Sequence, residues 1–256
     1  MTLLAQLSDP HVAVGPRDAG SARALTAAVD AVLAMSSQPE AVLVSGDLVT
    51  DPGAAEYERV CELLEPLPMP VHVLAGNHDD PDALREYFVA SGSSGSPSGP
   101  FQYAADVGEL RLIACDTRRA GSDGGGLGAE RLEWLEAQLD AQPAAPTIVA
   151  MHHTPLRTGN RAFDEIGLAE DDRTALADLL PRFPAVRRIV GGHFHRTIFD
   201  TLGGRGVFAC ASTHLQAPLE IGAGVVRIEE GRTPALAVHA ELGNDLVTHV
   251  EPIEQA

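Results

Sequence analysis

The sequence predicts an α/β protein, and three features of its pattern support this fold class. Short apolar runs of four to six residues alternate with segments in which apolar residues recur every three to four positions. Unbroken apolar runs are typical of strands covered on both faces, and the three-to-four spacing is typical of amphipathic helices. After about Gly203 the pattern changes to strand-like pieces without long helices. Strands that alternate with helices indicate an α/β chain, here with a β-rich C-terminal part.

Each predicted strand is a short apolar run that ends in polar residues. In chain order, the five strands are expected within residues 2–11, 40–47, 69–80, 146–153 and 187–193. Polar residues do not alternate with apolar ones in these runs, so each strand is expected inside a sheet that helices or a second layer cover on both sides.

Four segments between the strands are predicted to be amphipathic helices. They lie at residues 22–36, 56–67, 128–142 and 170–183. In the third, Leu132, Leu135 and Leu139 form one stripe, which predicts that this face is buried. The fourth begins with an acidic first turn and ends at a proline, which are both usual helix boundary signals.

Residues 1–256 are expected to form one domain with a sizeable core. Residues 88–100 are rich in Gly, Ser and Pro and are expected to form a flexible surface loop. Residues 217–256 are expected to be a β-rich C-terminal addition to the same domain. The strand-like pieces of this last part of the chain are residues 206–213, 224–231, 235–242 and 245–252.

The composition excludes several classes of function. With 18 basic and 36 acidic residues, the chain has a formal charge of -18, which repels nucleic-acid polymers and anionic lipid surfaces. Its three cysteines are widely spaced and form no metal-binding pair, so they are expected to be reduced. No segment resembles a signal peptide or a membrane span, and we therefore expect a cytoplasmic protein that does not act at a membrane.

Each of the five predicted strands is followed by residues that can bind a metal ion. These residues are Asp9 and His11, Asp47, Asn77 with His78, His152 with His153, and His193 with His195. In open α/β sheets, ligands bind beyond the carboxyl ends of the strands, so the five ends are expected to converge on one crevice. One such end is uninformative, but five in a single chain, all with oxygen or imidazole donors, predict a metal site.

The residues around these donors support a compact site. The proline after Asp9 is expected to push Asp9 toward an extended backbone, in which Asp9 and the histidine two residues later face the same side. Gly46, Gly76 and Gly192 stand just before predicted ligands, where a missing side chain allows a tight turn or a close approach. His152 and His153 are adjacent on a strand and must point to opposite faces, so only one is expected to reach the site. The residues alone leave open which one.

The number of donors predicts two ions. With one histidine of the doublet, the strand ends supply seven donor side chains, more than a catalytic site with a single ion uses. Two ions that share a bridging carboxylate accommodate seven donors, and metal pairs are a recurrent device for phosphoryl transfer. Mixed nitrogen and oxygen donors favour Mn, Fe or Zn, and we expect two divalent or trivalent transition-metal ions.

The motifs as a set resemble those of the calcineurin-like metallophosphoesterases. The matching phrases are DPH, GD, GNHD, HHTP and GHFH, in this order along the chain. Further phrases, such as GGGLGAERLEWLEAQL, GNRAFDEIGL and STHLQ, resemble the branch of bacterial class III cyclic-nucleotide phosphodiesterases and glycerophosphodiesterases. The resemblance implies a four-layer αββα sandwich, in which two mixed sheets face each other with helices outside.

The resemblance also implies a role for each site residue. One ion would be held by Asp9, His11 and His195, the other by Asn77, His153 and His193, and Asp47 would bridge the two. His78 would contact the substrate phosphate together with Asn77 and act with Asp47 in catalysis, protonating the leaving group. Asp79 would orient an imidazole from behind the ligands, His152 would stay outside the ligand set, and His214 would line the substrate pocket.

The activity that the resemblance implies is hydrolysis of small phosphodiesters, in which a hydroxide on the metal ions attacks phosphorus. The 3′,5′-cyclic nucleotide cAMP is the favoured substrate, and the alternatives are a glycerophosphodiesterase or a phosphomonoesterase of broad specificity. A binding scaffold of the same fold without catalysis is a remote alternative, because all seven donors are present. We expect a small phosphodiester as the partner and leave a homodimer open as the assembly.

Overall fold

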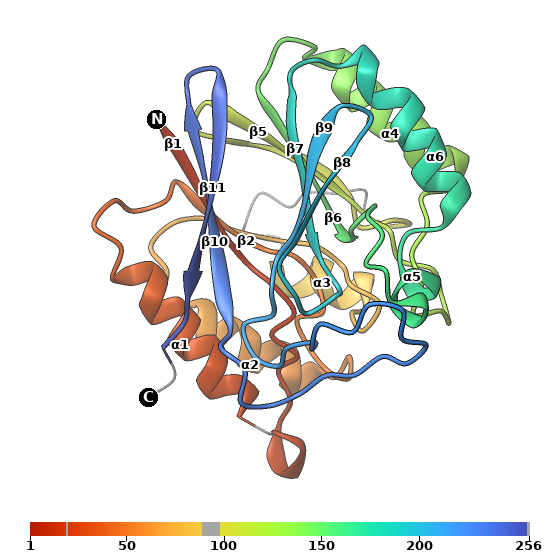
Figure 1. Cartoon of the computed structure of the whole chain (residues 1–256). Helices are drawn as coiled ribbons and strands as arrows, with labels where there is room; N and C mark the ends of the chain where they lie inside the picture. The colour runs from red at the N-terminus through yellow and green to blue at the C-terminus, as the bar shows by residue number, and fades with distance from the viewer. Residues whose placement is uncertain (19, 89–97, 255–256) are drawn as a thin grey trace.

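The computed structural model describes residues 1–18, 20–88 and 98–254 (Figure 1). Most of the loop predicted at residues 88–100 lies outside the described residues. Among those residues, no helix combines the length and the apolar character that a membrane crossing requires.

Eleven strands form two mixed sheets. The first sheet has the order β11-β10-β1-β2-β3, and the second has the order β4-β5-β6-β7-β9-β8. The strands of the first sheet are β1 (Thr2–Leu7), β2 (Ala41–Val44), β3 (Val71–Val73), β10 (Ala235–Leu242) and β11 (Asp245–Pro252). Those of the second are β4 (Tyr103–Val107), β5 (Leu110–Cys115), β6 (Thr147–His153), β7 (Val186–Gly192), β8 (Ile198–Leu202) and β9 (Arg205–Ala209).

Helices cover the outer faces of both sheets. Figure 1 shows α1 (Ser21–Leu33) and α2 (Ala54–Leu64) on one side of the molecule and α4 (Gly128–Ala141) and α6 (Glu170–Leu179) on the other. The remaining helices are α3 (Pro81–Phe88), α5 (Arg161–Ile166) and the short turns η1 (Gly15–Arg17) and η3 (Leu180–Arg182). Two mixed sheets with flanking helices confirm the predicted αββα fold class.

Parallel strands bring the motifs to one edge of the molecule. In the first sheet β1, β2 and β3 are parallel neighbours, and in the second β5, β6, β7 and β9 are parallel neighbours. Carboxyl ends of parallel strands meet at the same edge of a sheet, which is where ligands bind in open α/β folds. The carboxyl ends of β1, β2, β3, β6 and β7, together with the loops that follow them, carry the five predicted motifs.

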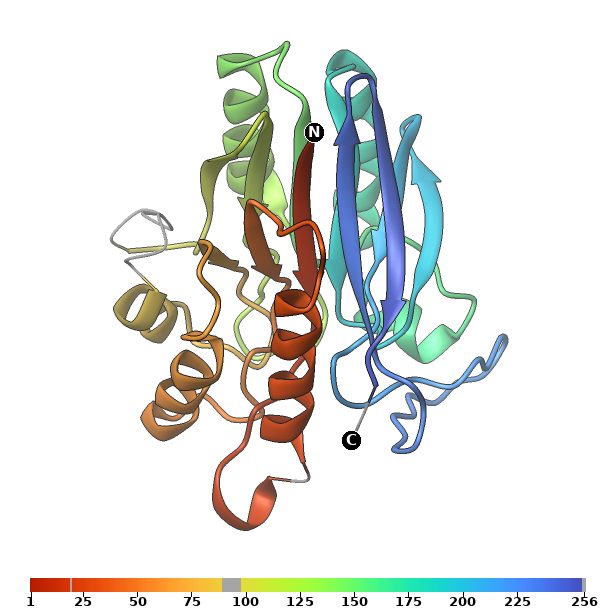
Figure 2. The same ribbon diagram turned by 90° about the vertical axis from the view of Figure 1, so that its left-hand side faces the viewer.

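The C-terminal hairpin extends the first sheet. Strand β10 pairs antiparallel with β1, and β11 pairs antiparallel with β10. Figure 2 shows this blue hairpin beside the red first strand. The strand that we predicted at residues 224–231 is not formed. This segment makes only an isolated β-bridge, between Glu229 and Gln216. The extent of the domain and of its C-terminal addition stays a prediction.

Two apolar clusters divide the core. The larger cluster joins the first sheet and its helices to the inner face of the second sheet, and the smaller one lies between the second sheet and α4, α5 and α6. Strand β6 contributes Ile148 and Ala150 to the larger cluster, and Val149 and Met151 to the smaller one. Its even-numbered side chains therefore face the first sheet, and its odd-numbered ones face the helices.

Candidate metal centre

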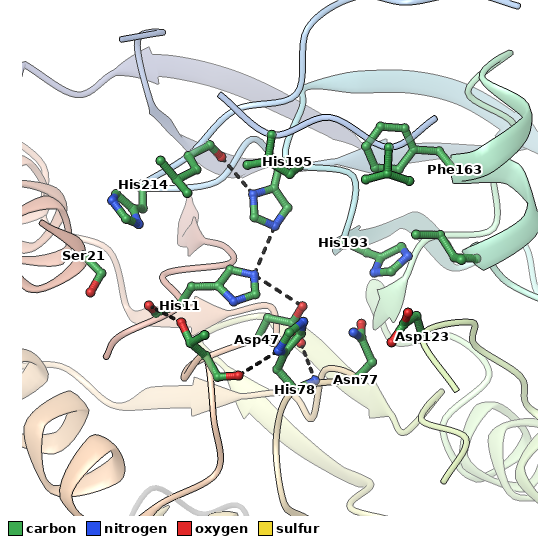
Figure 3. A pocket seen from close by; sticks show the side chains of 15 residues that line it. His11, Ser21, Asp47, Asn77, His78, Asp123, Phe163, His193, His195 and His214 are labelled. Atoms are coloured by element: carbon green, nitrogen blue, oxygen red, sulfur yellow. Dashed lines mark hydrogen bonds and ion pairs between the residues drawn. The ribbon is translucent and has the colours of Figure 1, made fainter. Parts of the chain in front are cut away.

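The predicted motifs meet at one cavity of about 540 Å³ (Figure 3). Of the residues that we expected to bind metal or substrate, its lining includes His11, Asp47, Asn77, His78, His193, His195 and His214. Asp9 and His152 lie behind this lining and are fully buried. The fold thus gathers into one place side chains that are spread over more than two hundred positions of the chain.

Five residues at this site hold the left-handed backbone conformation that residues other than glycine rarely adopt. They are Asp9, His11, Asp47, His193 and His195, with φ angles between 46° and 73°. Among the described residues, they are the complete set of non-glycine residues with positive φ. Such conformations cost about 1–3 kcal/mol each and persist where the surrounding structure fixes them, typically at functional sites.

The extended backbone that we expected for Asp9 is wrong, since its φ is 48°. The carboxylate is instead fixed by contacts across the sheets: both of its oxygens accept hydrogen bonds from the backbone N–H of His193, at 3.0 and 3.1 Å. This approach depends on Gly192, because a Cβ there would lie 2.4 Å from Asp9 Oδ2. The missing side chain at Gly192 thus leaves room for the carboxylate of Asp9.

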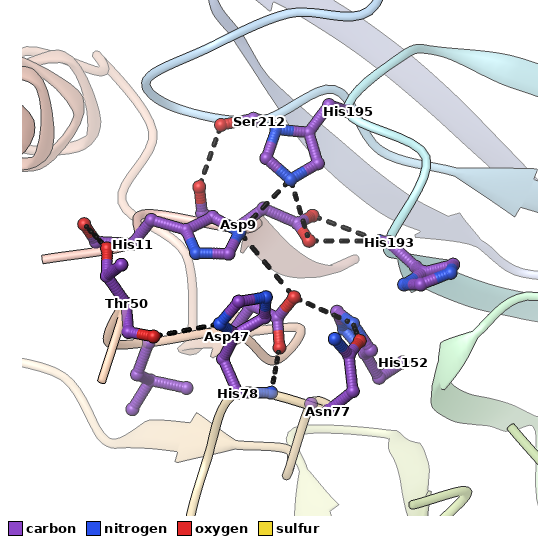
Figure 4. Close-up of polar contacts among 12 residues, drawn as sticks. Asp9, His11, Asp47, Thr50, Asn77, His78, His152, His193, His195 and Ser212 are labelled. Atoms are coloured by element: carbon purple, nitrogen blue, oxygen red, sulfur yellow. Dashed lines mark hydrogen bonds and ion pairs between the residues drawn. The ribbon is translucent and has the colours of Figure 1, made fainter. Parts of the chain in front are cut away.

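Asp9, His11 and His195 form the first group of donors (Figure 4). The Nδ1–H of His195 donates to the carbonyl oxygen of Leu215 at 2.8 Å, because a carbonyl can only accept. The lone pair of His195 is therefore on Nε2, which lies 3.1 Å from His11 Nε2 and 3.7 Å from Asp9 Oδ1. A backbone carbonyl that fixes the tautomer in this way is the usual support for a histidine that binds metal.

Asp47 lies between the two groups of donors. Its Oδ2 is 3.5 Å from His11 Nε2 on one side and 3.3 Å from His152 Nε2 on the other. Its Oδ1 accepts a hydrogen bond from the backbone N–H of His78 at 2.9 Å, which fixes the orientation of the carboxylate. This is the geometry that a bridging ligand requires.

The second group is built from Asn77, His152 and His193. The Nδ1–H of His152 donates to the carbonyl oxygen of Ser45 at 2.8 Å, which leaves the lone pair on Nε2. That nitrogen faces the amide oxygen of Asn77 at 3.3 Å, and the ring of His193 lies 5.2 Å from the ring of His152. Nε2 of His193 is buried without a hydrogen-bond partner among the described residues.

These donors fit a pair of metal ions. Lone pairs of imidazoles, carboxylate oxygens and an amide oxygen converge, and a cation is what such a set of acceptors requires. Asp9, Asp47 and several histidines form overlapping groups of three whose ligand atoms lie within 4.8 Å of one another. The unpartnered nitrogen of His193 is the clearest single sign, because a buried polar atom without a partner is costly.

The protonation states of Asp47, His11 and His193 suit metal binding, whereas His152 has to release a proton before it can bind a metal ion. Burial alone raises the pKa of Asp47, but His152 and His11 outweigh it and hold that pKa well below its usual range. Burial lowers the pKa of His152, yet the adjacent Asp47 carboxylate raises it to about 9. Burial lowers the pKa of His11 to about 3, and burial together with His153 keeps the pKa of His193 well below its ordinary value. Asp47 is thus ionised, and His11 and His193 are neutral, as metal ligands must be.

The contacts of the histidine doublet favour His152, and not His153 as we expected, as the ligand next to Asp47. His152, which we expected outside the ligand set, faces Asp47 and Asn77. His153 also lies within ligand distance of His152 and His193, but both of its ring nitrogens are engaged. Its Nε2–H donates to the carbonyl oxygen of Asp123 at 3.1 Å, and its Nδ1 accepts from the hydroxyl of Thr117 at 2.8 Å. No lone pair of His153 is left for a metal ion.

Strand β6 is irregular where the doublet lies, since its register against β7 shifts between Ala150 and His153. His152 follows Ile148 and Ala150 on the face of β6 that looks toward the first sheet, where Asp47 and Asn77 are. The ring of His153 lies 4.9 Å from the ring of His152 and 4.5 Å from that of His193, so it also stays next to the site. The prediction that the adjacent histidines point to opposite faces is therefore wrong here, because the irregular end of β6 leaves both rings close to the ring of His193.

Asp79 supports the site through the backbone and not through an imidazole. Its carboxylate accepts hydrogen bonds from the backbone N–H of Leu48 at 3.1 Å and of Gly76 at 2.9 Å. Among the described residues, it has no hydrogen bond to a histidine, so the role that we expected for it is wrong. Asp79 instead ties the loop after Asp47 to the loop before Asn77.

Several residues of the cavity escaped the sequence reasoning. The carbonyl of Asp123 and the hydroxyl of Thr117 hold His153, and both residues lie in a segment to which we assigned no site role. One wall of the cavity is apolar and consists of Phe163, Ile166, Leu215, Val226 and Ile228. Two phrases quoted above for their resemblance contain part of this wall, GNRAFDEIGL with Phe163 and Ile166, and STHLQ with Leu215.

Comparison with known proteins gives a consistent result. A family model described as calcineurin-like phosphoesterase matches residues 2–197. The 3′,5′-cyclic adenosine monophosphate phosphodiesterase CpdA of Pseudomonas aeruginosa is 30% identical over 218 residues, which cover 84% of this chain and 77% of that protein. The glycerophosphodiester phosphodiesterase GpdQ of Enterobacter lignolyticus is 38% identical over 162 residues, which cover 63% of this chain and 58% of that protein.

The fold matches a solved structure over its whole length. A dimetal phosphatase from Danio rerio superposes with a TM-score of 0.74, covering 100% of this chain and 99% of that one. The two chains are 16% identical, so this likeness bears on the fold alone.

Proposed function

The chain belongs to the calcineurin-like phosphoesterase family, and from this premise we propose that it hydrolyses small phosphodiesters, with 3′,5′-cyclic nucleotides such as cAMP as preferred substrates. The observation that carries the proposal is the convergence of seven donors, with Asp47 between Asp9, His11 and His195 on one side and Asn77, His152 and His193 on the other. We propose Mn, Fe or Zn as the ions, because the donors are nitrogen and oxygen without thiolate.

A bound metal pair supplies Lewis acidity for the phosphate and lowers the pKa of water. The chain itself supplies orientation and a proton. Nδ1–H of His78 donates to the carbonyl oxygen of Thr50 at 2.8 Å, which leaves Nε2 as the nitrogen available to the cavity. In the doubly protonated form of His78, the proton on Nε2 can pass to the ester oxygen as the P–O bond breaks. The oxygen of water forms the new bond to phosphorus, and the proton that water releases returns His78 to its doubly protonated form.

Two of the cysteines are poorly placed to act as nucleophiles in a covalent intermediate. Cys115 and Cys210 are buried, and burial raises the pKa of both thiols. Both side chains belong to the apolar core. Direct attack by water is therefore the route that the described residues favour.

The shape of the cavity supports a substrate with a flat apolar part. Its volume of about 540 Å³ lies in the range of small-molecule sites. The donors occupy one side, and the apolar wall from α5 and residues 215–228 occupies another. A cyclic nucleotide has a phosphate for the first side and a nucleobase for the second, and the CpdA relative is named for this substrate.

A glycerophosphodiesterase is the second candidate. The relative from Enterobacter lignolyticus that bears this name has the higher identity over the shorter match. Asp123, an exposed residue at the cavity, offers a carboxylate that could accept hydrogen bonds from the hydroxyls of glycerol. Nucleic-acid polymers are disfavoured as substrates by the formal charge of -18.

Steady-state kinetics with added Mn²⁺ test the proposal on cAMP, glycerophosphocholine and a chromogenic aryl phosphodiester. We expect kcat/KM for cAMP to exceed that for the aryl diester by at least about 10-fold, because pocket contacts discriminate to this extent. An equal or lower value for cAMP would contradict the preferred substrate. The scaffold alternative gains support if reconstitution leaves less than about one metal equivalent and no activity.

His78→Ala is expected to lower kcat by about 10²–10⁴-fold and to leave the metal content unchanged, because His78 donates a proton without holding an ion. Elemental analysis of the reconstituted protein and kinetics on the best substrate measure the two effects. His249→Ala, which removes an exposed histidine of β11, is the matched control. Loss of metal in His78→Ala would contradict the assigned role.

A further inference from the structure

We propose that Gln6, His239 and Thr248 are positioning residues for Asp9. They belong to a continuous chain of hydrogen bonds that runs from the C-terminal hairpin to the Asp9 carboxylate, with every proton donated toward Asp9. The inference rests on the proposed function in one respect, since it takes Asp9 to be a metal ligand. It assigns a task to the hairpin β10–β11, which none of the motifs covers.

Next to the metal centre, the chain of hydrogen bonds ends with two serines, Ser8 and Ser45. Oδ2 of the Asp9 carboxylate accepts a hydrogen bond from the hydroxyl of Ser8. The hydroxyl of Ser45 donates to Ser8 Oγ at 2.7 Å. Ser8, Asp9 and Ser45 are buried and have little or no contact with water.

Gln6 joins the two sheets at the middle of the chain. Its amide nitrogen donates to Ser45 Oγ at 2.9 Å and to the backbone oxygen of Gly191 on β7, also at 2.9 Å. Its amide oxygen lies 2.9 Å from Nε2 of His239 on β10. Since an amide oxygen only accepts, Nε2 of His239 carries the proton.

His239 and Thr248 carry the chain to the outer strand. With its proton on Nε2, His239 accepts at Nδ1 from the hydroxyl of Thr248 on β11, at 2.8 Å. Thr248 in turn accepts from the guanidinium of Arg188, which also donates to the backbone oxygen of Leu246 at 3.1 Å. Burial lowers the pKa of His239 to about 3, in agreement with a neutral ring.

The direction of the chain is fixed at both ends. A guanidinium can only donate and an ionised carboxylate can only accept, so no hydroxyl or amide between them can be reversed without losing a bond. In a buried chain of this kind, each hydrogen bond polarises the next. The chain therefore holds Oδ2 of Asp9 on Ser8 and presents Oδ1 toward His195.

The same chain also contacts the supports of other donors, and this distinguishes it from an ordinary buried network. The backbone oxygen of Ser45 fixes His152, and Gly191 immediately precedes the glycine against which Asp9 packs. A substitution that removes the hydrogen bonds of Gln6 is therefore expected to disturb the supports of donors in both groups. Outer partners of metal ligands typically change metal affinity by about 10- to 100-fold when they are removed.

The test is the dissociation constant for Mn²⁺, measured on metal-free protein by competition with a chromogenic chelator. Thr248→Val removes the hydroxyl at nearly constant shape, and we expect it to weaken Mn²⁺ binding by about 10-fold. Thr248→Ser keeps the hydroxyl and is expected to bind Mn²⁺ like the wild type. Gln6→Met breaks the chain at its centre and is expected to weaken binding by up to about 100-fold.

Two further measurements separate positioning from general destabilisation. Val250→Ala, which shortens an exposed side chain on the same strand, is expected to lower the thermal midpoint with unchanged Mn²⁺ affinity. The thermal midpoints of all variants are measured without metal. Equal Mn²⁺ affinity in Thr248→Val, Gln6→Met and the wild type would overturn the inference and leave the proposed function intact. A wild-type protein that binds none of Mn²⁺, Fe²⁺ and Zn²⁺ would overturn both.

Discussion

Asp47→Ala is expected to release metal from both groups of donors and to lower kcat/KM by more than about 100-fold. Oδ2 of Asp47 lies 3.5 Å from His11 and 3.3 Å from His152, so one side chain contacts the donors of both ions. Removal of a partner behind the ligands already costs about 10- to 100-fold, and loss of a bridging ligand is expected to cost more.

The Asp47 experiment combines elemental analysis with kinetics. Metal content per chain after Mn²⁺ reconstitution and gel filtration is expected to fall below one equivalent in Asp47→Ala. Asp140→Ala, which removes an exposed carboxylate on α4, controls for the change in charge and is expected to behave like the wild type. Two retained equivalents in Asp47→Ala would contradict the bridging role.

The elements that periodicity predicted are those whose burial follows a simple repeat. The helices expected at 22–36, 56–67, 128–142 and 170–183 correspond to α1, α2, α4 and α6. The missed α5 has six residues, which is too short for a repeat to be recognised, and β8 alternates half-buried and exposed residues at the edge of its sheet. Segment 224–231 shows the opposite error, because Val226 and Ile228 border the cavity without entering a sheet.

The position of the site was predictable, but its internal geometry was not. Motifs after successive strands imply one crevice because parallel strands share an edge. The positive φ angles of Asp9 and Asp47, by contrast, arise from contacts between loops distant in sequence. The chain from Thr248 to Asp9 likewise joins residues of both termini, which the local pattern of the sequence does not relate.

The histidine doublet shows what the sequence predicts and what only the structure provides. Alternation in the sequence predicts that one histidine reaches the donors, and the structure assigns this place to His152. Its Nε2 faces Asp47 and Asn77, whereas the ring nitrogens of His153 are held by Thr117 and Asp123.

His152→Ala is therefore expected to lose one metal equivalent and more than about 100-fold in kcat/KM, since it removes a ligand. His153→Ala is expected to keep two equivalents and to lose mainly stability, about 1–3 kcal/mol, because a buried hydroxyl and a carbonyl are left without partners. Metal content per chain and the free energy of unfolding in urea, measured on both variants, distinguish the two roles. Since the substitutions are adjacent and identical in size, each serves as the control for the other. Metal loss in His153→Ala with full retention in His152→Ala would reverse the assignment and would require the ring of His153 to exchange its bonds with Thr117 and Asp123 for a metal ion.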